Sequence, residues 1–404
     1  MAGKRGHGEG TIYKRKDGRW EAKASIGFDP ATGKPRRLTK YFKTRKEAQE
    51  WLAKVQHEKA TGTFVEPHRV TVGEWLDRWL NDYVKPRVRP KTWQGYKDVA
   101  RLHIIPEIGH IPLSKLQAGD LQRLYNSKME GGRADGKEGG LSSRTIHMMH
   151  QVIHGALKQA TKEQLIPRNV SEAVSLPKLR YKEIQPLTAE QVARFLEAAK
   201  SDRLYTAFLM DIGTGLRRGE LLALRWQDVD LKNGVVHVKQ SIGRVKVENG
   251  PTKTALVFSE PKTPKSRRTV PLPGEVLREL KEHKKRQAQE KLFFGQAYQD
   301  NGLVFCTEDG RPLDPDNFGK RYGRLLKKAG IPHVALHNLR HTCATLLLEA
   351  GEHPKIVQEL LGHSRINITL DIYSHVRPEM LQQAAAKLDG FLKAKEKPSS
   401  EGIR

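Results

Sequence analysis

The chain has little cysteine and no long apolar run, and each shortage narrows the class of protein. Only two cysteines occur among 404 residues, which fits a reduced cytoplasm better than a disulfide-built secreted scaffold. No stretch of about 18 apolar residues is present, so no membrane-spanning helix is expected. The basic segment Met1 to Gly10 lacks the apolar core of a secretory signal.

Acidic residues are scarce relative to basic ones. Lysine and arginine number 72 against 46 aspartate and glutamate, so the formal net charge is +26. Such a surplus attracts polyanions and favours a nucleic-acid partner, with a basic ribosomal or chaperone-like protein as the alternative on charge alone. A membrane-surface protein is less favoured, because no strongly amphipathic terminal helix stands out. A chain of this length is expected to form two or three domains.

Residues 1–66 are predicted to form three short strands followed by one helix. Asp17-Gly18 is a strong hairpin signal, and Thr32-Gly33 marks a second turn. Thr44, followed by Glu47 three residues later, predicts a capping box and therefore a helix start. The sheet could enter a DNA groove through one face, although a solvated face is an equally good account. Its basic and aromatic residues are Tyr13, Arg15, Arg19, Trp20, Lys23, Arg36 and Arg37.

Residues 67–178 are predicted to be mainly helical, after a linker at about 62–70. Thr71 and Glu74 form a second predicted capping box. The last helix carries three histidines. We expect them to lie on one face of the helix without binding a metal ion, because no cysteine or carboxylate completes a ligand set. Those histidines are His147, His150 and His154. The helices are expected at 71–84, 89–108 with a stop near Pro106, 114–129 and 142–165.

The rest of the chain, after a proline-bounded linker at 176–186, is predicted to mix helices and strands. Thr188 and Gln191 form a third capping box. A helix is expected at 217–226, after the turn "GTGL". Strands are expected at 234–240, 254–260 and 266–272. Further helices are expected near 274–292, 314–329, 337–350, 354–361 and 367–373, with a last one from about 377.

Four motifs in this last segment point to one family. They are, in chain order, "TGLRRGELLALRW", "EPKTPKSRRTVPL", "LHNLRHTCATLLLEAG" and "LGHSRINITLDIYSHV". Together they resemble the tyrosine recombinase (phage-type integrase) family over residues 187–390, and their order makes the match specific. The resemblance implies an α+β multidomain fold. It divides the chain into an arm-type DNA-binding domain at 1–66, a helical core-binding (SAM-like) domain at 67–178, and a catalytic domain with a C-terminal helix at 179–404.

The residue chemistry agrees with that resemblance. Breaking a phosphodiester needs a nucleophile, neutralisation of the non-bridging oxygens and a proton for the leaving oxygen. Arg217 matches the family's first arginine, and its planar fork suits two phosphate oxygens. Glu220, one helical turn away, can hold Arg217 in place, and a surface ion pair without a role in the site is the alternative account of these two residues. Arg218 is expected to point elsewhere.

The two middle motifs supply further candidates. Lys262 matches the lysine that the family carries on a hairpin turn, where it would protonate the leaving 5′-oxygen. His337 and Arg340 match the family's H-x-x-R pair and, at i and i+3 of a helix, can approach one phosphate together. His341 is expected to support them. A two-histidine zinc grip is disfavoured, because no third ligand follows. The basic loop could also simply grip DNA through Lys265, Arg267 and Arg268.

The last motif supplies the nucleophile. His363 matches the family's second histidine, an expected donor to the phosphate. Tyr373, ten residues later, is the candidate nucleophile. A free phenol has a pKa near 10, so such a tyrosine becomes reactive only among positive charges or beside a base. Without the upstream motifs, a core tyrosine would be the better account of Tyr373.

The resemblance also implies the reaction and its partners. Tyr373 would form a 3′-phosphotyrosyl link and free a 5′-hydroxyl, without ATP, metal or other cofactor. Four protomers would act on two double-stranded attachment sites, with core and arm sequences, aided by a directionality factor or DNA-bending protein. The terminal helix would dock on a neighbouring protomer or on its own domain. The alternatives are a type IB topoisomerase, which relaxes supercoils as a monomer, and a non-catalytic DNA-binding regulator.

Overall fold

The structure is a computed structural model with two compact units, Met1–Tyr181 and Lys182–Arg404. It describes residues 10–28, 32–62, 64–65, 69–133, 136–179, 185–247, 254–260, 267–363 and 365–372. The helix expected from about 377 lies outside this described part. Within the described part, no helix is both long and apolar enough to cross a bilayer.

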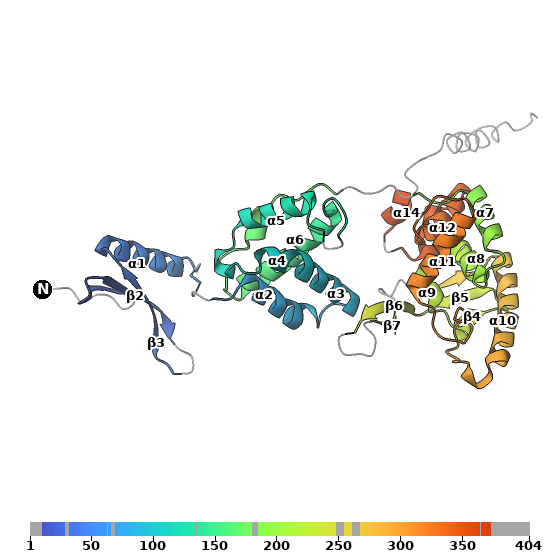
Figure 1. Cartoon of the computed structure of the whole chain (residues 1–404), viewed down its shortest axis with the longest axis horizontal. Helices are drawn as coiled ribbons and strands as arrows, with labels where there is room; N and C mark the ends of the chain where they lie inside the picture. Colours follow the sequence, from blue (N-terminus) through green and yellow to red (C-terminus); the bar gives the residue numbers. More distant parts are fainter. Residues whose placement is uncertain are drawn as a thin grey trace, which may run out of the picture. The chain divides into compact units, whose positions relative to one another are not determined.

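The N-terminal segment is a three-stranded antiparallel sheet with one helix on it, as predicted (Figure 1). The two turns lie where the glycines require them, with φ of +82° at Gly18 and +65° at Gly33. Thr44 and Glu47 form the predicted capping box at the start of the helix. Its small core lies between helix and sheet and includes Ala24, Leu52 and Val55. The elements are β1 (Thr11–Lys14), β2 (Trp20–Phe28), β3 (Pro35–Phe42) and α1 (Arg45–Ala60).

The next segment is a helical bundle whose core contains three buried tryptophans, Trp75, Trp79 and Trp93. Trp75 donates its ring N–H to the carbonyl of Ala156 at 2.9 Å, and Trp93 donates to Leu80 at 2.9 Å, so neither polar ring atom is left unpaired in the core. The helices are α2 (Val72–Arg78), α3 (Pro90–Val99), α4 (Ile105–Ile108), α5 (Ala118–Glu130) and α6 (Ser143–Lys162). Single π-helical segments, Trp79–Val84 and Ala100–Ile104, continue α2 and join α3 to α4.

The helical stretch predicted at 89–108, with a stop near Pro106, ends at Ile108 in the structure. The chain stays helical through the π-helical segment, and Pro106 lies in the first turn of α4, which ends at Ile108. Proline is tolerated there because the first turn of a helix needs no backbone N–H donor.

The second unit is mainly helical with two small antiparallel sheets. One sheet has the order β4-β5-β8 and the other pairs β6 with β7. The strands are β4 (Val229–Asp230), β5 (Val235–Val238), β6 (Ser241–Lys246), β7 (Thr254–Ser259) and β8 (Arg268–Pro271). The helices are α7 (Ala189–Ala199), α8 (Tyr205–Thr214), α9 (Arg218–Leu222), α10 (Gly274–Phe294), α11 (Pro315–Lys328), α12 (Asn338–Glu349), α13 (Pro354–Leu361) and α14 (Asn367–Ile372).

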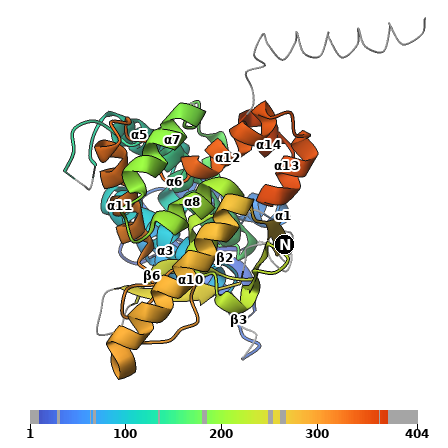
Figure 2. The same cartoon turned by 90° about the vertical axis from the view of Figure 1, so that its right-hand side faces the viewer.

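Helix α8 lies at the centre of this unit, where α7, α10 and α12 pack against it (Figure 2). The sequence reasoning did not identify α8, nor strands β4 and β6. It also made the helix at 217–226 too long, because α9 ends at Leu222. The backbone beyond it pairs with a distant segment instead. Leu224 accepts from the N–H of Val304 at 2.8 Å, and Trp226 donates to Gly302 at 2.9 Å.

Candidate functional site

The turn after α8 is built so that two helices can approach it closely. Gly215 ends α8 in the left-handed conformation, with φ of +58°, and its N–H bonds the carbonyl of Asp211. A Cβ on Gly215 would lie 2.3 Å from Leu361 and 3.3 Å from the sulfur of Cys343. Glycine is therefore required here by both backbone conformation and space.

Arg217 follows this turn directly and is held on two sides. Its guanidinium donates to Glu220 Oε1 at 2.7 Å and to the carbonyl of Gly362 at 2.9 Å, and its side chain is 37% exposed. Its neighbour Arg218 donates instead to the carbonyl of Pro315 at 2.9 Å, so it does point elsewhere.

Glu220 is a buried carboxylate between two arginines. Its Oε1 accepts from Arg217, and its Oε2 accepts from Arg268 at 3.0 Å. Burial alone would raise the pKa of Glu220, but the charges of Arg268 and Arg217 outweigh it and hold this pKa below its ordinary value. A paired internal carboxylate of this kind is not the surface ion pair that the sequence left open.

Arg340 is almost fully buried, at 2% exposure. It donates to the carbonyl of Gly215 at 2.6 Å and to the carbonyl of Leu361. Burial, together with the positive charges of Arg217 and Arg268, lowers its pKa to about 9. Among the ion pairs of the described residues, none involves Arg340. A guanidinium has five N–H donors, so several remain for another acceptor.

The two arginines therefore bind adjacent carbonyls. Arg340 bonds Leu361 and Arg217 bonds Gly362, and His363 is the next residue along the chain. Three separate segments thus meet: the start of α9, the first turn of α12 and the end of α13. The sequence predicted that Arg217, Arg340 and His363 belong to one site, and the structure brings all three together.

His363 is buried and held by a threonine. Its Nδ1 lies 2.9 Å from Oγ1 of Thr369, a fully buried residue of α14. Burial and the nearby charges of Arg340 and Arg217 lower the pKa of His363 to about 3, so the ring is neutral near pH 7. The sequence reasoning missed Thr369, although its place six residues after His363 and four before Tyr373 is a usable signal.

His337 and His341 lie on α12, with their rings edge-to-face at a centroid distance of 5.0 Å. His337 stands just before the first residue of the helix and is exposed, whereas Nδ1 of His341 is buried without a hydrogen-bond partner in the described part of the chain. Burial lowers the pKa of His341 to about 4, and the neighbouring His337 and Arg340 add to the effect. Three further predicted residues, Lys262, Lys265 and Tyr373, lie outside the described residues.

Asp211 is a buried acid that the sequence reasoning missed. It is 2% exposed, and its backbone carbonyl holds the N–H of Gly215. Burial raises the pKa of Asp211 to about 8, only partly offset by Arg340 and Arg218. This carboxyl is therefore mostly neutral at pH 7 and leaves the charge of Arg340 largely uncancelled. Its place in the apolar run "AFLMDIG" is the signal that could have identified it.

The predicted DNA-contacting residues of the N-terminal sheet gather mostly on its uncovered face. Arg15 and Arg19 stack over the Tyr41 ring at 4.8 and 5.7 Å, and Lys23 bonds the Tyr13 hydroxyl at 3.1 Å. Arg37 pairs in register with Ser25, on the same face as Lys23 by strand alternation. Arg36, the adjacent residue, points to the opposite face by the same alternation.

The two arginines predicted to grip DNA beside β8 differ sharply. Arg267 is 59% exposed and pairs with Glu260 at 2.8 Å. Arg268 is only 7% exposed and is bonded to Glu220 and to the carbonyl of Leu360. The burial of Arg268 does not fit a direct DNA contact, because strand alternation turns it inward where Arg267 faces out.

The histidines of α6 serve as internal hydrogen-bond partners. His147 Nε2 lies 2.9 Å from the carbonyl of Pro177, His150 lies 3.2 Å from the Tyr125 hydroxyl, and His154 lies 3.0 Å from the Ser171 hydroxyl. Across the described ranges, no group of three or more His, Cys, Asp or Glu is arranged to hold a metal ion.

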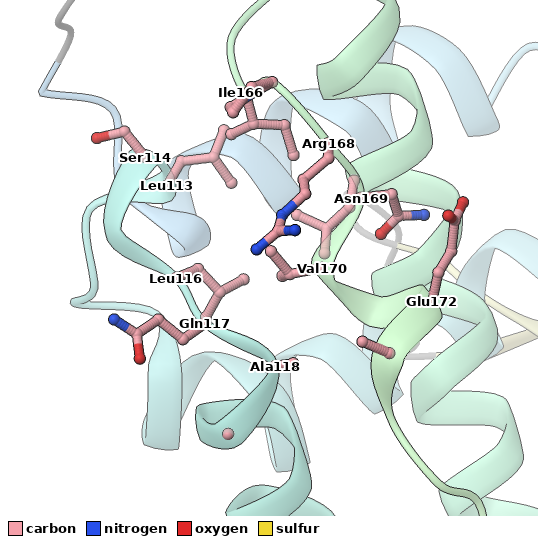
Figure 3. A pocket seen from close by; sticks show the side chains of 14 residues that line it. Leu113, Ser114, Leu116, Gln117, Ala118, Ile166, Arg168, Asn169, Val170 and Glu172 are labelled. Atoms are coloured by element: carbon pink, nitrogen blue, oxygen red, sulfur yellow. The ribbon is translucent and has the colours of Figure 1, made fainter. Parts of the chain in front are cut away.

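The helical segment also contains a cavity of about 700 Å³ with an apolar floor (Figure 3). Leu116, Ile166 and Val170 line it, and Arg168 extends its guanidinium into it. All fourteen residues that line the cavity belong to the first unit.

The neutral histidines predict an acid-sensitive fold. Because the pKa values of His341 and His363 lie below their ordinary value, the unfolded chain binds more protons than the folded one between about pH 6.5 and pH 4. The contribution of these two histidines to stability should therefore fall as pH falls through this window, by about 1.4 kcal/mol per pH unit for each fully titrating histidine. The raised pKa of Asp211 acts in the opposite direction, but it is one group against two. Melting curves at pH 7.0 and 5.5 should show a lower Tm at pH 5.5. A double change His341→Gln and His363→Gln should reduce that difference, and an unchanged difference would contradict the assignment.

Thr369→Val should slow the DNA cleavage that the sequence predicts by about tenfold, the cost of one buried hydrogen bond. The substitution keeps the shape of the side chain but removes the partner of His363 Nδ1, so the ring is free to rotate. Thr369→Ser keeps the hydroxyl and should restore most of the rate. The measurement is single-turnover cleavage of an attachment-site duplex. Equal rates for the valine variant and the unaltered protein would show that Thr369 does not orient His363.

Comparison with known families agrees with this geometry. The model of the Phage integrase family matches residues 185–380. The model of the Phage integrase N-terminal SAM-like domain matches residues 71–129, and that of the Arm DNA-binding domain matches residues 11–59. Each match falls within a segment for which the sequence predicted the corresponding domain.

Individual relatives extend over nearly the whole chain. A tyrosine recombinase XerC-like protein of Caldanaerobacter subterraneus subsp. tengcongensis is 34% identical, over 90% of this chain and 94% of its own length. An integrase of Streptomyces ambofaciens is 30% identical, over 97% and 99%. The solved structure of the Tn1549 transposon integrase, in complex with transposon right end DNA, matches with a TM-score of 0.63 and 25% identity, over 79% of this chain and 99% of that one. The chain belongs to the phage integrase family of tyrosine recombinases and is a site-specific DNA recombinase.

Proposed function

We propose that Tyr373 is the nucleophile of this recombinase, and that Arg217 and Arg340 together hold the scissile phosphate. The carrying observation is that these two guanidinium groups bond the adjacent carbonyls of Gly362 and Leu361, directly before His363. Arg340 has no ion-pair partner among the described residues, so a bound phosphate would supply the missing anion. The described chain ends one residue before Tyr373, in α14, which Thr369 ties to His363.

The remaining roles follow from the chemistry of the side chains. Lys262 protonates the departing 5′-oxygen, and His337 bonds a non-bridging oxygen or accepts the tyrosine proton. We assign Nε2 of His363 as a donor to the phosphate, with Thr369 bonded to the other ring nitrogen. Tyr373 attacks phosphorus, the phosphate–5′-oxygen bond breaks, and a 3′-phosphotyrosyl link forms. The freed 5′-hydroxyl of the partner strand then attacks this link and releases the tyrosine.

The substrates we propose are the attachment sites of a mobile element, because integrases and a transposon integrase bound to transposon DNA are among the similar proteins. The N-terminal sheet would hold arm sites through Arg15, Arg19, Lys23 and Arg37, while Lys265 and Arg267 would contact DNA near the core site. Four protomers would act together in the cytoplasm on two duplexes, aided by a directionality factor or DNA-bending protein. The segment from about 377 would link neighbouring protomers.

The test is covalent trapping on a nicked attachment-site duplex, in buffer containing a metal chelator. The nick lets the short 5′ fragment diffuse away, so the protein–DNA adduct accumulates. We expect a protease-sensitive adduct whose attached nucleotide maps by mass spectrometry to the peptide containing Tyr373. Tight binding without an adduct would favour the non-catalytic regulator. Supercoil relaxation by a monomer, without strand exchange, would favour the type IB topoisomerase.

A further inference from the structure

Arg268 connects the parts of the site that come from distant positions in the sequence. Its Nε donates to the carbonyl of Leu360 at 2.7 Å, at the end of α13. Its NH2 donates to Glu220 Oε2 at 3.0 Å, in α9. Arg268 itself is the first residue of β8 and follows the 261–266 segment that contains Lys262. The buried guanidinium of Arg268 therefore bonds the segments that contain Arg217 and His363. In the sequence, Arg268 lies close to the segment that contains Lys262.

The surroundings of Arg268 are shaped around it. A Cβ on Gly362 would lie 3.0 Å from Cδ of Arg268, and Gly362 has φ of +68°. Glycine is thus favoured at Gly362 both by its backbone conformation and by the approach of this side chain. The pKa of Arg268 is lowered by burial and only partly restored by Glu220, so the carboxylate is the main partner that keeps its charge in the interior.

The charge arrangement argues against a role in gripping DNA. The side chain of Arg268 is 7% exposed and that of Glu220 is 3% exposed, so a phosphate would have to displace a buried carboxylate. Arg267, the adjacent residue, is 59% exposed and pairs with Glu260, which is itself 79% exposed, so a phosphate could replace this surface partner. Substitutions of Arg267 and Arg268 must therefore be tested for different effects, on DNA binding for Arg267 and on the reaction rate for Arg268.

We infer that Arg268 is a positioning residue of the recombination site, which acts on Arg217 through Glu220. Oε1 of Glu220 accepts from the guanidinium of Arg217, and Oε2 accepts from Arg268 and, at 3.2 Å, from the backbone N–H of Arg217. Arg268 thus helps to fix the carboxylate in the orientation that holds the Arg217 guanidinium against Gly362. Without Arg268, Oε2 keeps only the backbone N–H of Arg217, so the carboxylate can turn toward the Arg217 guanidinium and draw it away from the carbonyl of Gly362. A displacement of about 1 Å in a clamp of this kind typically costs about 100-fold in rate. This inference rests on the proposed phosphate-binding role of Arg217.

The experiment measures adduct formation on the nicked duplex with Arg268→Met and Arg268→Lys, at saturating DNA. We expect the rate to fall about 10- to 100-fold for the methionine variant, with the Kd for DNA and its salt dependence unchanged. The lysine variant, which keeps a charge but has no fork, should fall between the methionine variant and the unaltered protein. Arg278→Met removes an exposed arginine of α10 that pairs with Glu275, and should leave the rate unchanged.

Three readouts separate positioning from general damage. Misfolding lowers the final amount of adduct, whereas a positioning defect slows its formation and leaves the final amount the same. Combining Glu220→Gln with Arg268→Met should be no slower than the slower single variant, because both act on one contact. A DNA contact would instead weaken binding and reduce the salt slope by about 1, the result expected for Arg267→Met.

The outcomes for the two proposals are distinct. If the unaltered protein forms no adduct, the proposed function fails and the inference about Arg268 fails with it. If the unaltered protein forms the adduct and Arg268→Met matches its rate, only the inference about Arg268 is overturned. A higher Kd with a smaller salt slope would also overturn it and would restore Arg268 as a DNA contact.

Discussion

Tyr373→Phe is expected to abolish adduct formation and strand exchange while leaving DNA binding intact. The phenyl ring keeps the shape of the side chain but lacks the oxygen that attacks phosphorus. The groups proposed to hold the phosphate are untouched, because Arg217, Arg340 and His363 bond to α9, the turn after α8, α13 and Thr369. Loss of a covalent nucleophile commonly costs on the order of 10⁴-fold or more. The measurements are adduct yield on the nicked duplex and Kd by gel shift.

Tyr298→Phe is the matched control for this change. Tyr298 lies in the loop after α10, with its hydroxyl 3.5 Å from the sulfur of Cys306 and the ammonium of Lys291 over its ring. Neither of these partners is a proposed catalytic residue. Its loss should leave adduct yield unaltered. An adduct that persists in Tyr373→Phe would refute the assignment of the nucleophile and direct the search to another tyrosine.

The second large effect is expected from Arg340→Lys, which should slow cleavage about 10²–10³-fold, the usual cost of removing one preorganised donor from a developing anion. Lysine keeps a positive charge, but a single ammonium cannot bond Gly215 and Leu361 while it also faces two phosphate oxygens. The rate should therefore fall much more than the affinity for DNA, because many other phosphate contacts support binding.

Single-turnover rates and Kd, measured on the same duplex, test this expectation. Arg324 lies on the exposed side of α11, so Arg324→Lys is the control that shows whether an arginine-to-lysine exchange by itself changes the rate. A thermal melt establishes that the buried lysine has not unfolded the second unit. Equal cleavage rates for Arg340→Lys and the unaltered protein would remove Arg340 from the phosphate clamp.

Local signals in the sequence predicted much of the fold. The capping boxes at Thr44, Thr71 and Thr188 all form, and α10 to α14 lie where the apolar periodicity placed them. These features depend on residues three or four apart, which a sequence shows directly. Helix α8 was missed because it is apolar on nearly every side, as expected for a helix at the centre of a unit, and has no amphipathic pattern.

The site was predictable in its residue types but not in its supporting contacts. The motifs brought Arg217, Arg340 and His363 into one hypothesis, and they do lie together. The inward orientation of the Arg268 side chain and the burial of the Asp211 carboxyl both depend on packing between segments that are far apart in the chain. Arg268 and its carboxylate partner are 48 positions apart, and no local pattern encodes that contact.

The end of α13 has an electrostatic consequence for the clamp. The carbonyls of Leu361 and Gly362, which accept from Arg340 and Arg217, lie at the C-terminus of this helix, where the helix dipole places a negative partial charge of about half an electron. Glu220 already offsets part of the charge of Arg217 and Arg268, so a further carboxylate at this place would cancel another positive charge. A helix terminus instead orients the guanidinium groups and would leave the charge of Arg340 available to the proposed phosphate.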